Sequence, residues 1–462
     1  MVTPLPARRK RLALAVVAAS AFFLSVDLTF VNVALPDIGH DLGASVSGLA
    51  WVVDTYNVAL TGMLLLGAAM AERLGRTRVF LGGLMLFTLA SLAAGLAPDL
   101  GALLGARVMM GVGAGLLLAP ALAITAMVFP PGERAGAVAT WSSAGALGLA
   151  LGPVLGGVIV GTLGWRWAFL LTVPFLVVAA VVGLRVLPDG RGAASAASDW
   201  SGAVLSVVAL VPLVTALIEA PRLGWGDPRI IGLLLAGVVL MTAFVVRELR
   251  ARQPVLDVRM LRRPGVLGAS TALFASYVSF MGIVFLVSLE AQLLTGLGAL
   301  AYGLLLAPRA VAYWLTTRAT TRLTRAGHGT QALAMGLVLM VVAFAVLAFA
   351  PAGIAWTLTA LVLDGVGAGL VVPVGVVVVL NDVPASAMST ASGLSVASRF
   401  AGSTIGVALL ASVAVAGSGT LAEGITNGYI AGGALMLVLT PVAVIALLRR
   451  DRHHQALGAG PG

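Results

Sequence analysis

The chain has 462 residues, of which 60% are hydrophobic and only 10% are charged. Soluble domains carry about 25% charged residues, so this composition excludes a water-soluble enzyme, a nucleic-acid-binding domain and a disordered scaffold. The net charge of +10 does not indicate nucleic-acid binding, because the basic residues, nearly all arginines, lie in short clusters between apolar runs. Cytoplasmic loops of membrane proteins have this pattern. The absence of cysteine excludes disulfides, thiolate metal sites and cysteine nucleophiles.

Apolar runs bounded by charges, glycine and proline predict a series of membrane-spanning helices. A bilayer core of about 30 Å requires about 20 apolar residues per helix, and fourteen runs meet this length. We therefore expect an all-α integral membrane protein. In chain order, the predicted helices cover residues 12–34, 48–70, 79–97, 101–128, 135–160, 165–187, 201–218, 230–247, 266–292, 299–318, 331–350, 353–380, 389–415 and 428–448.

The distribution of arginine and lysine predicts the orientation of these helices. Of the 28 basic residues, 22 fall on one side of the membrane, three on the other and three within helices. The positive-inside rule places the basic side, and with it both chain termini, in the cytoplasm. The first helix is about 23 residues long and contains Asp27, so we interpret it as a membrane span and not as a cleaved signal.

An internal repeat divides the chain. The sequence at 111–116, Gly-Val-Gly-Ala-Gly-Leu, recurs at 365–370, 254 residues later, and the same offset maps 12–187 onto 266–441. Two six-helix halves with a site between them are typical of alternating-access transporters. The expected parts are a cytoplasmic tail at 1–11, an N-terminal half at 12–187, a linker with two extra helices at 188–265, a C-terminal half at 266–448 and a cytoplasmic tail at 449–462.

Four segments carry a family resemblance. They are Leu24-Ser-Val-Asp-Leu-Thr-Phe-Val-Asn-Val-Ala-Leu-Pro36 in the first helix, Gly67 with Ala71-Glu-Arg-Leu-Gly-Arg-Thr-Arg78 after the second, Arg107 with Gly111, Gly113 and Gly115 in the fourth, and Gly148, Gly152, Pro153, Gly156 and Gly157 in the fifth. Together, over about residues 12–450, they resemble the major facilitator superfamily and more closely its fourteen-helix drug:proton antiporter family. Glu72 stands where that family usually has Asp.

The resemblance implies the major facilitator fold, with two inserted helices between the six-helix halves. It implies a proton-coupled antiporter in the cytoplasmic membrane that exports drug-like or natural-product molecules by alternating access. The expected partners are an amphipathic small molecule, protons and membrane lipids, with a monomer as the working unit. We expect no enzymatic activity, cofactor, metal ion or nucleic acid. A dedicated exporter of one metabolite, an importer and a non-transporting membrane scaffold remain alternatives.

Asp27, Asp54 and Arg107 are the candidates for proton coupling. An ionisable residue inside a bilayer costs at least ~2.5–3.5 kcal/mol, so it is a functional candidate by default. At about 1.5 Å per residue, all three lie about 9–10 Å from the outer ends of their predicted helices. Desolvation disfavours a charged carboxylate there and a nearby arginine favours it, which suits reversible protonation. The alternatives are a packing hydrogen bond from Asp27 to Thr29 or a neighbouring hydroxyl, a purely structural Asp27–Arg107 pair, and an Asp54 that merely lines the outer mouth.

The second half carries a different charged set near the midplane, Arg309, Asp364 and Arg399. Buried arginines require a carboxylate or a group of carbonyls, so we expect Asp364 to contact Arg309 or Arg399. These residues either set substrate preference or simply neutralise each other. Glu290 lies near the outer end of its helix and is a candidate for the substrate cavity or for the membrane interface.

The loop after the second helix is the candidate gate. Its residues are Gly67, Glu72, Arg73, Gly75 and Arg76. We expect the acid to pair with a helix end or an arginine when the cytoplasmic side is closed and to release it on opening. The alternative is a basic loop that only fixes topology.

The fifth helix carries the candidate antiporter motif, Gly148, Gly152, Pro153, Gly156 and Gly157. Glycines at every fourth position form one smooth stripe, and proline weakens the helix. We expect a hinge and a seal against proton leak, with the stripe facing a helix of the other half. Ordinary small-residue packing is the alternative.

Overall fold

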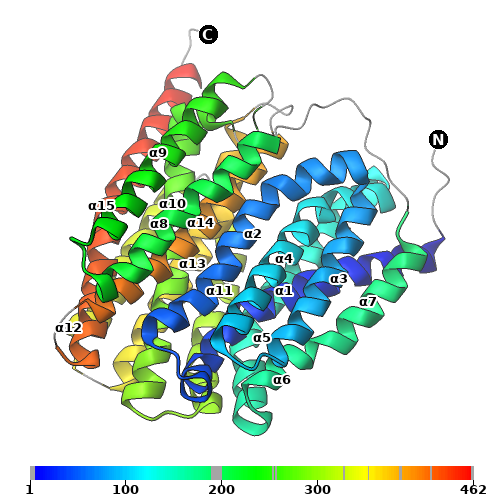
Figure 1. Ribbon diagram of the computed structural model, residues 1–462. Helices are drawn as coiled ribbons and strands as arrows, with labels where there is room; N and C mark the ends of the chain where they lie inside the picture. Colours follow the sequence, from blue (N-terminus) through cyan, green and yellow to red (C-terminus); the bar gives the residue numbers. More distant parts are fainter. Residues whose placement is uncertain are drawn as a thin grey trace. The chain divides into compact units, whose positions relative to one another are not determined.

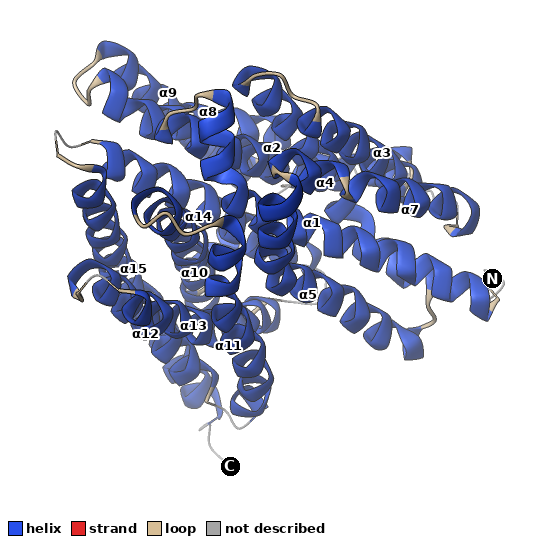
Figure 2. Cartoon of the chain, turned by 90° about the horizontal axis from the view of Figure 1, so that it is seen from below, coloured by secondary structure: helices blue, strands red, loops and turns tan. Residues whose placement is uncertain are grey.

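The computed structural model describes residues 6–188, 200–251, 254, 257–325, 328–351, 353–383, 388–416 and 419–458. Every regular element in these ranges is a helix, with no strand among them (Figure 2). This confirms the predicted all-α class. Parts of the predicted tails and central linker, at 1–5, 189–199, 252–253, 255–256 and 459–462, lie outside the described residues.

Each of the fourteen predicted helices has a counterpart, and the sixth is divided into α6 and α7. Short helices of other types lie at Val258–Arg262 (3-10) and at Leu289–Leu294 (π). The α-helices are α1 (Ala7–Leu42), α2 (Val46–Leu74), α3 (Arg76–Gly95), α4 (Leu100–Val128), α5 (Pro131–Leu163), α6 (Trp165–Leu170), α7 (Thr172–Val186), α8 (Trp200–Leu223), α9 (Pro228–Arg250), α10 (Pro264–Ser288), α11 (Ala299–Arg325), α12 (Gly329–Phe349), α13 (Ile354–Asn381), α14 (Met388–Val415) and α15 (Leu421–Gly458).

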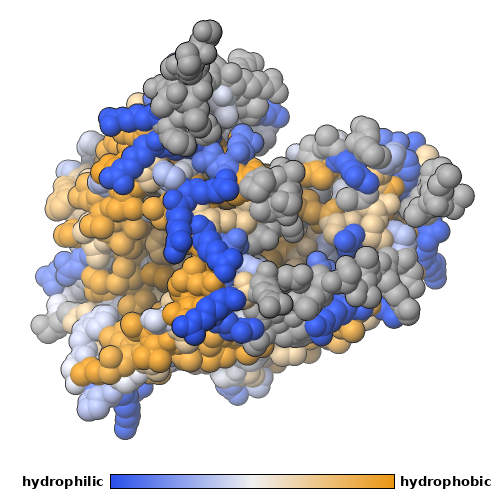
Figure 3. Space-filling view, turned by 90° about the horizontal axis from the view of Figure 1, so that it is seen from above, coloured by the Kyte–Doolittle hydropathy of each residue, from blue (hydrophilic) through white to orange (hydrophobic). Residues whose placement is uncertain are grey.

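These helices have the length and composition of membrane spans. Within the described residues, twelve pass by length and hydropathy, and α2 makes a thirteenth if its two segments, which meet at 41°, count as one span. Helix α11 has 27 residues, enough to cross a bilayer, but its arginines lower its hydropathy. Large apolar side chains such as Leu89, Phe175 and Val239 are exposed, and Figure 3 shows extensive hydrophobic areas on the surface. A lipid-facing surface has this character.

The chain forms two compact units. Unit 1 comprises Met1–Val211 with Thr295–Ala307, and unit 2 comprises Pro212–Leu294 with Pro308–Gly462. In unit 1, α1 packs along α5, and both α2 and α3 pack on α4 (Figure 1). In unit 2, α10 packs against α14 and α15, and α12 packs on α13.

The glycine repeat makes equivalent helix contacts in the two units. A Cβ atom on Gly111 of α4 would lie 2.4 Å from the carbonyl oxygen of Tyr56 in α2. A Cβ atom on Gly365 of α13 would lie 2.4 Å from the carbonyl oxygen of Arg309 in α11. Both positions bring backbone against backbone, an approach that only a residue without a side chain permits. The sequence repeat therefore corresponds to a repeated packing arrangement.

Candidate functional site

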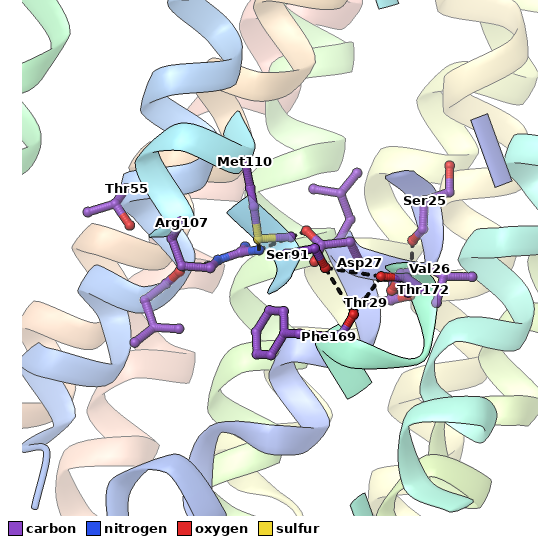
Figure 4. A network of polar contacts seen from close by, with 12 residues as sticks. Ser25, Val26, Asp27, Thr29, Thr55, Ser91, Arg107, Met110, Phe169 and Thr172 are labelled. Carbon is purple, nitrogen blue, oxygen red and sulfur yellow. Dashed lines mark hydrogen bonds and ion pairs between the residues drawn. The ribbon is translucent and has the colours of Figure 1, made fainter. Parts of the chain in front are cut away.

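A buried ion pair lies within unit 1. Arg107 of α4 donates from Nη1 to Oδ2 of Asp27 of α1 at 2.8 Å, and each residue is only 1% exposed. Figure 4 shows the arginine side chain extending toward the aspartate. Of the described residues, Asp27 and Arg107 are thus the two sequence candidates for proton coupling that the fold joins directly.

Arg107 also contacts α2. Its Nε donates to the carbonyl oxygen of Val52 at 3.0 Å, and its guanidinium carbon lies 4.3 Å from the ring centroid of Tyr56. Met110, one turn further along α4, contributes a thioether sulfur 3.9 Å from Nη1. A single side chain therefore connects α4 with α1 and α2. The aromatic face stabilises the guanidinium by a cation–π interaction in a desolvated setting.

Only one of the two carboxylate oxygens of Asp27 is hydrogen-bonded to a described residue. Its Oδ1 atom is buried and has no hydrogen-bond partner among the described residues, while Oδ2 accepts a hydrogen bond from Arg107. The hydroxyl of Thr29 bonds to the carbonyls of Ser25 and Val26, so the expected alternative of a Thr29–Asp27 bond is wrong. A buried carboxylate oxygen without a donor is costly in the charged state. This oxygen is the chemically natural position for a proton.

The expected depth of Asp27 needs correction, and the alternative that Asp54 merely lines the outer mouth does not fit its burial. Helix α1 continues to Leu42, so Asp27 lies fifteen residues from its outer end and not seven. Asp54 is fully buried in α2, but no hydrogen bond or ion pair between described residues joins it to Asp27 or Arg107. Its polar neighbour is Asn57, on the same helix. Asp54 is therefore a separate buried acid, whereas Asp27 is the partner of the arginine.

A second buried ion pair lies in unit 2. Arg309 of α11 binds Oδ2 of Asp364 of α13 through Nη2 at 2.5 Å and Nε at 2.7 Å. Ser279 of α10 donates to the other carboxylate oxygen at 2.5 Å. The guanidinium lies 4.0 Å from the ring centroid of Phe280. The predicted Asp364–Arg309 contact is confirmed, and both oxygens of this carboxylate have partners.

Arg399 and Glu290 occupy different settings in unit 2. Arg399 of α14 does not contact Asp364; its guanidinium lies 5.6 Å from the ring centroid of Tyr277 in α10. Glu290, in the π-helical segment after α10, accepts a hydrogen bond from the hydroxyl of Tyr429 at 2.6 Å. Glu290 is thus anchored to α15, and π-helical turns occur frequently at functional positions.

The candidate gating loop forms a tight turn. Gly75 has φ of 101°, a conformation that favours glycine, and it separates α2 from α3. Glu72 and Arg73 are exposed, and Glu72 forms no ion pair with any described residue. Gly67 is buried where α2 approaches Gly115 of α4. The loop geometry suits a short connection. In this conformation Glu72 is not paired with any described residue. Arg76 begins α3 and is half-buried.

The glycine stripe of α5 faces a different neighbour from the one expected. A Cβ on Gly148 would lie 2.3 Å from the carbonyl oxygen of Phe22, and one on Gly156 would lie 2.8 Å from Cβ of Phe30. Gly152 likewise lies against α1, at the hydroxyl of Thr29. The expectation that this stripe meets a helix of the other half is therefore wrong. Residues at spacing four share a face, but the spacing does not identify the helix opposite.

The other side of α5 meets the start of α11. A Cβ on Gly157 would lie 2.7 Å from the carbonyl oxygen of Ala299, and one on Gly303 would lie 2.3 Å from the carbonyl oxygen of Pro153. Ala299 and Gly303 fall within the predicted C-terminal half (266–448), although they pack as part of unit 1. Pro153 and Gly157, unlike the stripe, therefore do meet a helix of that predicted half. The candidate antiporter motif thus packs closely on two sides, against α1 through one set of glycines and against α11 through Pro153 and Gly157.

Several contributors were not identified from the sequence. Tyr56 beneath Arg107, and Ser279 with Phe280 around Arg309, complete the two ion pairs. A usable signal exists for α10, where hydroxyl and aromatic residues alternate within an otherwise apolar helix that includes Tyr277. Polar side chains are rare in such helices and mark positions that face protein rather than lipid.

Comparisons with known proteins agree with this architecture. The model of the Major Facilitator Superfamily matches residues 17–407. The chain is 32% identical to the multidrug resistance protein Stp of Mycobacterium tuberculosis (strain CDC 1551 / Oshkosh), over 88% of this chain and 76% of Stp. It is 34% identical to the cephamycin export protein CmcT of Amycolatopsis lactamdurans, over 92% of this chain and 91% of CmcT. It is 31% identical to the tetracenomycin C resistance and export protein of Streptomyces glaucescens, over 85% of this chain and 74% of that protein.

Solved structures support the same fold. A crystal structure of a peptide transporter POT in complex with sulfate superposes with a TM-score of 0.70 at 17% identity, covering 95% of each chain. At this identity the likeness concerns the fold alone. Taken with the family match over most of the sequence, it establishes that this multi-pass membrane protein belongs to the Major Facilitator Superfamily.

Proposed function

We propose that this protein exports drug-like or natural-product small molecules across the cytoplasmic membrane in exchange for protons, by alternating access. Relatives that align over most of the chain are described as resistance or export proteins for multiple drugs, cephamycin and tetracenomycin C. The same activity in this chain would confer resistance to antibiotics. The asymmetric arginine distribution supports an orientation with both termini in the cytoplasm.

The half-paired carboxylate of Asp27 is the observation that carries the proton coupling. In the ionised state, Asp27 holds Arg107 through a single oxygen, and the second oxygen is enclosed without a donor. Binding a proton neutralises the acid and leaves the arginine with the Val52 carbonyl and the Tyr56 ring. The charge attraction between α1 and α4 then disappears. Protonation thereby changes the relative energies of conformations in which these two helices are together or apart.

Asp54 is the second proton candidate, and the loop and the fifth helix provide the mechanical parts. Asp54 is fully buried and has no cationic partner among the described residues, so its ionised form is energetically unfavourable. Glu72, unengaged here, is available to pair with an arginine or a helix end in another conformation. The close contacts of α5 on two sides support a role as hinge and seal.

The test is a growth-inhibition panel in a drug-sensitive bacterial host. Cells carrying the gene, an empty vector or the Asp27→Asn variant are exposed to cationic, neutral and anionic compounds. We expect the native chain to raise the inhibitory concentration of at least one compound. We expect Asp27→Asn to lower it to the level of the empty vector, although the variant protein is still present in the membrane, because an amide cannot gain and lose the proton.

A matched control uses another aspartate of the same unit. Asp99 caps α4, accepting a hydrogen bond from the Ala102 amide at 2.8 Å, and Asn serves equally well at this position. Asp99→Asn should therefore retain full resistance. Export that survives a protonophore would refute proton coupling, and greater uptake of compound by cells with the gene would indicate an importer. No change in accumulation for any compound would favour a scaffold.

A further inference from the structure

Two neighbouring aromatic rings of α10 each lie beneath an arginine in unit 2. Tyr277 and Phe280 have ring centroids 5.7 Å apart, with a tilt of 36° between the rings. The guanidinium of Arg399 lies 5.6 Å from the Tyr277 centroid, and that of Arg309 lies 4.0 Å from the Phe280 centroid. We call these four residues, with Tyr313 of α11 within electrostatic reach of both arginines, the arginine–aromatic cluster.

The two arginines of the cluster differ in their charge balance. Arg309 is neutralised by Asp364, whose second oxygen is occupied by Ser279. Arg399 forms no ion pair with any described residue, and its buried Nε atom has no hydrogen-bond partner. The cluster therefore carries one positive charge that no described residue balances.

An unbalanced arginine at this position requires an explanation. Arg399 lies near the middle of the 28-residue α14, far from both ends. Charged groups within membrane helices are costly and face protein or water-filled space, where they mark substrate or ion pathways. Arg309 is buried, but Arg399, Tyr277, Tyr313 and Phe280 are each half-buried, so these four side chains are not fully sealed inside the helix packing.

We infer that Arg399, with Tyr277 and Tyr313, forms a subsite for the acidic group of an aromatic substrate, such as a carboxylate or an ionised phenol. The guanidinium supplies two or more N–H donors in a plane, a geometry that matches a carboxylate. The half-buried rings of Tyr277 and Tyr313 supply a surface on which a planar ring can stack. This inference rests on the proposed export function and specifies its substrate class: anionic aromatic compounds rather than cations alone.

The test measures binding and does not depend on transport. The purified full-length chain in phosphatidylcholine nanodiscs, in chloride-free gluconate buffer, is titrated with 2-naphthoate and with its neutral isostere 2-naphthamide. Charge-assisted hydrogen bonds are strong enough that we expect about tenfold tighter binding of the carboxylate. In Arg399→Gln the two compounds should bind equally, with naphthamide affinity unchanged. Arg399→Lys should keep part of the preference, because it retains the charge but loses the planar fork.

Arg318→Gln is the matched control. The guanidinium of Arg318 also lies over an aromatic ring of unit 2, 3.6 Å from the centroid of Trp314. Arg318 differs from Arg399 in that it is exposed and lies in the last third of α11. This variant should keep the full preference for naphthoate. Monodisperse elution of each variant confirms that it is folded.

Three outcomes would overturn the inference. The native chain could bind the two naphthalene compounds equally, or Arg399→Gln could keep the preference for the carboxylate. Thirdly, the preference could vanish when anionic phosphatidylglycerol is added to the nanodiscs, which would identify a lipid headgroup as the counter-ion. If the native chain gave no resistance in the growth assay, by contrast, the proposed function would be refuted, and the ratio of naphthoate to naphthamide affinity would be unaffected.

Discussion

Replacing Asp364 by Asn tests whether the Arg309–Asp364 pair is a structural element of unit 2. Asn preserves the size of the side chain and can still accept the hydrogen bond from Ser279, but it leaves Arg309 without its counter-charge. Arg309 is only 6% exposed, so water cannot replace the lost carboxylate. Removing one partner of a buried ion pair costs about 3–5 kcal/mol, and we expect a loss of unfolding free energy of this size.

Removing the second charge should recover much of that loss. In the double variant Arg309→Gln with Asp364→Asn no buried charge remains unpaired, so its cost should be smaller than that of Asp364→Asn alone. The coupling between the two substitutions should reach at least about 1–3 kcal/mol in a double-mutant cycle. Chemical unfolding in detergent, followed by the fluorescence of the eight tryptophans, measures each value.

Two results would refute this reasoning. If the unfolding free energies of Arg309→Gln and Asp364→Asn each lay within about 0.5 kcal/mol of that of the native chain, the pair would contribute nothing to stability. The double variant could also lose as much unfolding free energy, within about 0.5 kcal/mol, as the sum of the losses in Arg309→Gln and Asp364→Asn. This result would show that the two side chains act independently despite their 2.5 Å contact.

Two further predictions concern packing and a hydrogen bond. Gly111→Ala and Gly365→Ala should each lower the unfolding free energy in detergent by about 1–3 kcal/mol, because the new methyl group meets a backbone carbonyl. Gly232→Ala is the control: a Cβ atom at this position has no atom within 4 Å, so the variant should be neutral or slightly stabilised. Tyr429→Phe should cost about 1.5–3 kcal/mol in the same assay by removing the hydrogen bond to Glu290, and an unchanged midpoint would contradict this assignment.

The sequence predicts the helical architecture well because the length of each apolar run reflects the thickness of the bilayer. Helix ends are less accurate. The predicted first helix covers 12–34, whereas α1 covers Ala7–Leu42. Polar residues beyond the apolar run remain helical, and the helix ends only at Gly43, whose φ of 62° closes it in the left-handed conformation. Hydropathy cannot detect such an extension, which lies outside the predicted bilayer core.

For the candidate site, charge balance predicts that an ion pair exists but not which residues form it. Two arginines and one aspartate within the predicted helices of the second half suffice to predict that Asp364 has an arginine partner. Choosing Arg309 over Arg399, and placing Ser279 on the second oxygen, depends on how each helix is rotated about its axis. The same limit explains the error over the stripe at Gly148, since periodicity defines a face but not its neighbour.

The close contacts at Gly111 and Gly365 have a consequence for how this protein can diversify. Both contacts consist of backbone on backbone, so they offer no side chain that could be exchanged to recognise another compound. Adaptation toward new cargo, in nature or in the laboratory, must therefore leave these crossings intact and act through side chains that project away from them. A library that keeps both crossings invariant while randomising side chains of α10 and α14, which take part in neither crossing, would be enriched in intact transporters.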